Sequence, residues 1–197
     1  MSVTTLRRLG GLAGLLCGLA LCFNAARRGE LVPSTEFTRA LAPLAQLFGL
    51  FLLTTLYVRV RAATGRTGLV GYVLNSVGLA GLVGAEYIVN FVFPYLSDDE
   101  VQGFVDGPAG TMFTVTQVVF LTGVLVFVVA LLRSRLVPAP GVLLYGIGAV
   151  PIGLRGVLPD VTLYPGLVLA ALGAAWLGWA LWSGADVERP ASRAAAY

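Results

Sequence analysis

The stretch TGLVGYVLNSVGLAGLVGAEYIVNFVF, residues 67–93, contains one charged side chain, Glu86, among apolar, small and uncharged polar residues. As an α-helix it would be about 40 Å long, at 1.5 Å per residue. The hydrocarbon core of a bilayer is about 30 Å thick, so a helix of this length and composition can cross it. The stretch therefore predicts a transmembrane helix.

Outside this stretch the chain repeats the same pattern. A template of about 20 apolar residues also fits, or nearly fits, residues 6–24, 40–58, 111–132, 141–158 and 162–182, with 141–158 the marginal case. Clusters rich in Pro, Gly, Ser and Asp separate these runs. The sequence predicts an all-α protein, a polytopic bundle of about six transmembrane helices over residues 1–184, followed by a short polar tail over 185–197.

Composition supports a membrane class and excludes several mechanisms. The chain of 197 residues is 57% hydrophobic and only 12% charged, against about 25% charged in soluble domains. Every basic residue is Arg, and there is no Lys or His, so a retinal Schiff base, a haem held by His and a Ser-His-Asp triad are excluded. Cys17 and Cys22 have neither redox nor metal-knuckle spacing. We expect no metal and no cofactor.

The arginines indicate orientation. They stand at the ends of apolar runs and form no basic face with interleaved aromatics, so no nucleic-acid partner is predicted. Arginines occur near both termini and in every second connection between the runs. These groups are Arg7 and Arg8, then Arg59, Arg61 and Arg66, then Arg133 and Arg135, and finally Arg189 and Arg193. The positive-inside rule places these connections and both termini in the cytoplasm, for a multi-pass protein of the bacterial plasma membrane. One outer loop is an exception, because Arg27, Arg28 and Arg39 outnumber Glu30 and Glu36 there.

The first predicted helix also has a ridge of small residues. Gly10, Gly14 and Gly18 recur every four residues, which places them on one face and allows another backbone to approach closely. This ridge predicts a packing surface, either for another helix or for a homo-oligomer.

Two segments resemble a family of small bacterial six-helix membrane proteins known mainly as a domain of unknown function. The first is RRLGGLAGLL from Arg7, and the second is LLRSRLVPAPGVLLYGIG from Leu131, where a helix ends in Arg-Ser and a Pro turns the chain before a Gly opens the next helix. The resemblance implies a six-helix fold and gives neither an activity nor site residues.

Two ionisable side chains are predicted inside the membrane, Glu86 and Arg155. Placing a charged side chain near the centre of a transmembrane helix costs at least about 2.5 kcal/mol, so each of the two is expected to have a structural or functional role. Both fall in the outer half under the predicted topology, at similar depth, where a carboxylate and a guanidinium could pair. Pro151 should break the fifth helix one turn before Arg155.

Further polar residues accompany Glu86 and Arg155 on the same and the neighbouring predicted helices. They are Asn75 and Asn90 on the third predicted helix, Gln46 on the second and Gln117 on the fourth. Asn75 and Glu86 are eleven residues apart and share a helix face to within about 20°. We expect these side chains to form a pocket that opens outward or into the outer leaflet.

Three functional hypotheses follow. The leading one is a non-enzymatic protein of the lipid bilayer that binds or moves a small lipophilic or amphipathic molecule through this pocket. The second is a cyclase or isomerase of isoprenoid substrates in which Glu86 donates a proton. The third is a structural or accessory subunit that uses the glycine ridge, in which case Glu86 and Arg155 form only a structural ion pair. A further alternative has Arg155 extending to the headgroups and leaving Glu86 protonated.

Overall fold

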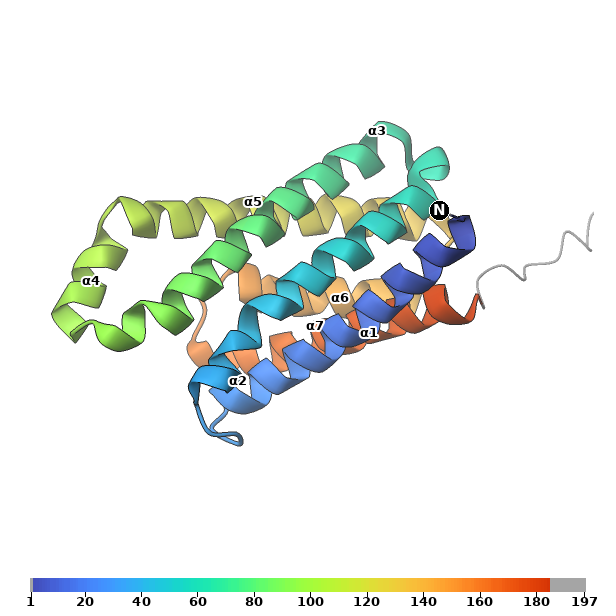
Figure 1. Ribbon diagram of the computed structural model, residues 1–197. Coiled ribbons are helices and arrows are strands. Elements are labelled where there is room, and N and C mark those ends of the chain that lie inside the picture. Colours follow the sequence, from blue (N-terminus) through green and yellow to red (C-terminus); the bar gives the residue numbers. More distant parts are fainter. Residues whose placement is uncertain (1, 185–197) are drawn as a thin grey trace, which may run out of the picture.

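The computed structural model describes residues 2–184, and over this range the chain is a bundle of helices without strands (Figure 1). The helices are α1 (Val3–Arg28), α2 (Glu36–Ala40), α3 (Ala42–Phe91), α4 (Asp98–Asp106), α5 (Pro108–Ser134), α6 (Ala139–Gly153) and α7 (Leu163–Ser183), with 3₁₀ turns η1 (Phe93–Tyr95) and η2 (Asp160–Thr162). The predicted all-α class is confirmed. The predicted tail, 185–197, lies outside the described residues.

Helix α3 folds back on itself at Gly65. This glycine has φ 53° and ψ −137°, a conformation that side chains with a Cβ rarely adopt. The two arms, 42–64 and 66–91, then lie side by side: the Tyr57 and Tyr72 rings stack 4.4 Å apart, and Thr54 Oγ1 lies 3.3 Å from Tyr72 Oη. The runs predicted at 40–58 and 67–93 are therefore the two arms of α3, joined by a sharp turn instead of the expected loop.

Within residues 2–184, four helices, α1, α3, α5 and α7, are long and apolar enough to cross a membrane. Helix α6 is apolar but shorter, with 15 residues. Large apolar side chains also cover the outside of the bundle, among them Phe51, which is 65% exposed, Val77 and Ile147. An apolar exterior of this extent is typical of a surface that contacts lipid.

Two helix ends and one connection differ most from the predictions. Helix α1 continues past residue 24 to Arg28. Helix α6 ends at Gly153 instead of residue 158, two residues after Pro151, which lies inside the helix. The acidic connection after α3 is not a plain loop, because Ser97 and Glu100 form a capping box that starts α4.

The connections gather at two ends of the bundle. The Gly65 turn and the α5–α6 junction share one end, where Arg59 Nε donates to the Leu136 carbonyl at 3.2 Å. Gly184, just after α7, lies beside the Arg7 guanidinium, and Figure 1 shows the N-terminus at that same end. The connections 29–41, 92–107 and 154–162 lie at the other end, which we call the polar end for the side chains described below.

The glycine ridge of α1 packs inside the bundle. A Cβ on Gly14 would lie 2.6 Å from Gly178 Cα, and one on Gly18 would lie 2.7 Å from the Ala171 carbonyl oxygen, both on α7. Gly10 faces Thr55 of α3 in the same way. The close backbone approach predicted for this ridge is thus made with the same chain, which leaves no room there for a helix of a second copy.

Candidate functional site

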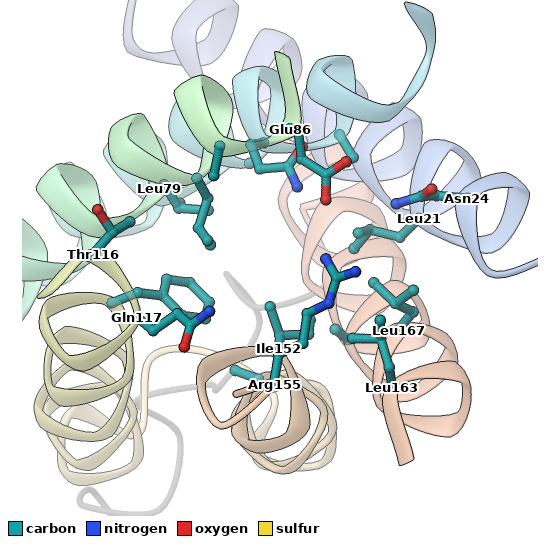
Figure 2. A pocket seen from close by; sticks show the side chains of 18 of the residues that line it. Leu21, Asn24, Leu79, Glu86, Thr116, Gln117, Ile152, Arg155, Leu163 and Leu167 are labelled. Atoms are coloured by element: carbon teal, nitrogen blue, oxygen red, sulfur yellow. The ribbon is translucent and has the colours of Figure 1, made fainter. Parts of the chain in front are cut away.

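A cavity of about 310 Å³ lies among α1, both arms of α3, α5, the end of α6, and α7 (Figure 2). It extends along α3 from Gln46 to Leu56, ten residues or roughly 15 Å of helix. Most of its wall is aliphatic, with Leu52, Leu79 and Leu167 among the buried lining residues. Small residues such as Gly49 leave this space unfilled.

Polar side chains line this cavity toward the polar end of the bundle. They are Asn24 and Arg28 from α1, Gln46 and Glu86 from α3, Thr116 and Gln117 from α5, and Arg155 from the turn after α6. Figure 2 shows Asn24, Glu86 and Arg155 extending into the space that the helices enclose. The cavity therefore has an apolar body and one charged end.

Glu86 forms an ion pair with Arg28. Arg28 Nη2 lies 3.0 Å from Glu86 Oε1 and 3.2 Å from Oε2, and the two side chains are only 14% and 13% exposed. Asn90, one turn along α3, donates from Nδ2 to Glu86 Oε2 at 2.8 Å. Both carboxylate oxygens thus accept hydrogen bonds from groups that can only donate at those atoms.

Glu86 also has a partner that the sequence analysis did not expect. The guanidinium bonded to Glu86 belongs to Arg28, which continues α1 beyond its predicted end. Arg155 lines the same cavity, where its guanidinium points inward from the turn that follows α6 (Figure 2). Helix α6 continues through Pro151 and ends at Gly153, so Arg155 lies in the turn after the helix.

Gln46 has an unusual environment. Its side chain is 8% exposed and lines the cavity, yet its Oε1 atom is buried without a hydrogen-bond partner among the described residues. A buried acceptor without a partner costs about 1–3 kcal/mol. Such atoms in a native protein indicate a missing donor, from water or from a ligand.

The inner part of the cavity contains a second polar contact. Asn75 Nδ2 donates to Tyr145 Oη at 2.8 Å, and the hydroxyl lies 3.3 Å from Asn75 Oδ1. Tyr145 lines the cavity, while Asn75 is fully buried behind it. Asn75 was predicted to line the pocket. In the structure it donates a hydrogen bond to Tyr145, and Tyr145 lines the pocket.

Four of the six predicted site residues line the cavity, namely Glu86, Arg155, Gln46 and Gln117. Asn90 and Asn75 contact lining residues instead. The sequence analysis missed Arg28, Asn24 and Tyr145. A signal for Arg28 was present, because Arg27 and Arg28 violate the positive-inside pattern.

Comparisons of the chain with protein-family models, curated proteins and solved structures gave no match.

The geometry limits the chemistry of the site. Glu86 accepts hydrogen bonds at both oxygens, from Arg28 and from Asn90. Within residues 2–184, no group of three His, Cys, Asp or Glu side chains comes together in a way that could hold a metal ion.

Proposed function

We propose that the protein binds or moves a small amphipathic molecule, with the apolar part in the aliphatic body of the cavity and the polar part beside Arg28, Glu86 and Arg155. The observation that supports this most is the division of one cavity into an aliphatic wall and a single charged end. Ligand pockets of about 300–1,000 Å³ with a few converging polar groups have this character, and the cavity of about 310 Å³ falls at the small end of that range.

The proposal places the protein in the bacterial plasma membrane as a multi-pass protein. The end of the bundle with the Gly65 turn and the α5–α6 junction carries Arg7, Arg8, Arg59, Arg61, Arg66, Arg133 and Arg135. By the positive-inside rule this end faces the cytoplasm, together with both termini. The charged end of the cavity then lies on the outer side, where an amphipathic molecule can enter from the outer leaflet.

The surplus arginines of the outer connection support the same proposal. Arg28 is engaged by Glu86 inside the bundle, and Arg27 donates to Asn24 Oδ1 at 3.1 Å. These two cations are therefore tied to the charged end of the cavity and its surroundings, which accounts for their presence against the topological rule.

The test is to fill the cavity. A Cβ at Gly49 would meet Cys17 Sγ at 3.6 Å and the Leu79 methyls at 3.8 and 3.9 Å, which are ordinary contacts. Gly49→Leu should therefore fold while its side chain occupies the cavity that Gly49 lines. Gly84→Leu is the matched control, because its Cβ would meet nothing within 4 Å.

Native mass spectrometry of the detergent-purified protein provides the readout. Wild type and Gly84→Leu should retain a co-purified or added single-chain amphiphile, and Gly49→Leu should lose it while keeping the elution volume and melting temperature of a folded protein. Equal retention by all three proteins, or an empty wild type after incubation with amphiphiles, would refute the proposal.

A further inference from the structure

Gln46 has a buried hydrogen-bond acceptor that the rest of the described chain does not use. The side chain lines the cavity and is only 8% exposed. Two other polar residues of the same wall have partners, because Asn24 accepts from Arg27 and Glu86 accepts from Arg28. No donor within residues 2–184 reaches Gln46 Oε1. The wall of the cavity therefore contains an amide oxygen whose partner has to come from elsewhere.

The position of Gln46 on α3 places it at the cavity and not in a helix contact. Gly49 and Leu53 follow it at intervals of three and seven residues, which share one face of an α-helix. Both of these residues line the cavity. Gln46 is thus the polar member of a stripe that otherwise gives the first arm of α3 its apolar, cavity-facing side.

An amide oxygen in this position selects between ligands of the same shape. The oxygen of a side-chain amide can only accept a hydrogen bond, so an O–H or an N–H is needed to satisfy it. A ligand without such a donor leaves a buried acceptor unpaired, and that loss is what makes a hydrogen-bonding site reject an isostere that lacks the hydroxyl. An aliphatic wall alone discriminates much less between such ligands.

We propose that Gln46 determines specificity, and that the ligand presents a hydroxyl or N–H to its Oε1 atom. This inference rests on the proposed function and narrows the ligand to a protic amphiphile, of which a long-chain alcohol is the simplest example. Ethers, esters of tertiary groups and hydrocarbons are disfavoured, because none of them has a donor for Gln46.

Two probes differ in the donor. A long-chain primary alcohol has an O–H, whereas the methyl ether with the same number of heavy atoms keeps an oxygen acceptor and has no donor. In competition for wild-type protein in detergent, read by native mass spectrometry, the alcohol should be retained about tenfold or more above the ether. This ratio corresponds to ~1.4 kcal/mol or more, as expected when one buried acceptor is left unpaired.

Gln46→Met assigns the preference to this residue, because Met is similar in size and lacks the amide oxygen. The alcohol-to-ether ratio should fall to near unity. The ligand-free variant should melt at or above the temperature of wild type, since the exchange removes a buried unpaired acceptor. Gln102→Met, at an exposed residue of α4, is the control and should leave the ratio as in wild type.

The outcomes separate this inference from the proposed function. The role of Gln46 is overturned, while binding stands, if wild type retains both probes equally, as it would if water alone satisfied Oε1. A preference for the ether, or a preference for the alcohol that persists in Gln46→Met, overturns it as well. A ligand-free Gln46→Met protein that melts below wild type would show that Gln46 has a structural partner instead. Retention of neither probe by wild type would contradict the proposed function itself.

Discussion

Arg28 at the last turn of α1 and Glu86 on the second arm of α3 are joined by an ion pair of 3.0 Å across 58 positions of sequence. The pair ties the end of one helix to another at the charged end of the cavity. It also gives Glu86 a structural role, because the carboxylate would be costly to bury without a cation beside it.

The first prediction concerns this pair. Glu86→Gln and Arg28→Met each leave a charge without its partner, and each should lower the free energy of unfolding by about 3 kcal/mol, the low end for breaking a buried pair. The double variant buries neither charge and should recover much of this loss. Thermal unfolding of the four proteins in the same detergent gives the coupling. Losses that simply add would show that the two residues act independently.

Gly65 provides a second prediction. Its positive φ makes Gly65→Ala strained, although nothing lies within 4 Å of the added Cβ, so the loss should be about 1–3 kcal/mol and purely conformational. Gly84→Ala tests the same exchange within an ordinary helical segment of α3 and should stabilise by about 0.5–1 kcal/mol. Melting temperatures that move in the same direction for both variants would argue against the folded-back turn.

Much of this architecture could be predicted from sequence because it depends on local properties. Apolar runs indicated the helices, and Pro151 indicated the early end of α6 that places Arg155 in a turn. The partner of Glu86 could not be predicted in this way. It depends on which helix packs beside the second arm of α3. It also depends on about one further turn of α1 after residue 24, where a loop with Arg27 and Arg28 was predicted.

The Gln46 environment and the Tyr145 contact are likewise tertiary. Gln46 was predicted as a pocket residue, but that its buried Oε1 has no partner among residues 2–184 depends on how the helices pack around the cavity. Tyr145 belongs to α6 and Asn75 to α3, 70 positions away, and no periodicity relates the two. The sequence could indicate polar residues at one depth, whereas their pairing required the packed structure.

Tyr145 gives the third prediction. Tyr145→Phe removes the hydroxyl that pairs with the fully buried Asn75 amide, so an unsatisfied donor remains and the free energy of unfolding should fall by about 1–3 kcal/mol. The preference for the alcohol over the ether should not change, because Gln46 is unaltered. An additional Asn75→Leu exchange should restore part of the stability. If the Tyr145→Phe protein melts like wild type, the contact is not made in solution.

The fourth prediction is a pH dependence at α4. Hydrogen bonds from the Ser97 backbone N–H and hydroxyl to the Glu100 carboxylate lower the pKa of Glu100 below its ordinary value. Because the pKa is lowered in the folded state, the capping box stabilises α4 fully above about pH 4.3, the ordinary pKa of Glu. This stabilisation is lost as the pH falls through the lowered pKa. Helix α4 should therefore fray in acid while α5 stays intact.

Amide hydrogen exchange over Asp98–Asp106, corrected for intrinsic rates, measures this effect, with α5 as the internal reference. Glu100→Gln should exchange faster than wild type at neutral pH and lose the acid-dependent step. A wild-type α4 whose protection stays the same as the pH falls from neutral through the full range in which carboxylates take up protons would be inconsistent with the capping box.

The cavity itself can be probed by photo-crosslinking. A single-chain alcohol with a diazirine on its alkyl chain is bound to the purified protein and illuminated, and the modified residues are identified by mass spectrometry. Neighbouring residues of α3 provide the discrimination, because Leu52 lines the cavity and is buried while Phe51 is exposed on the outside of the bundle. A ligand in the cavity should modify Leu52 and Leu56, and excess unlabelled amphiphile should suppress those adducts. Adducts confined to Phe51 and other outward residues would show that the molecule only coats the surface.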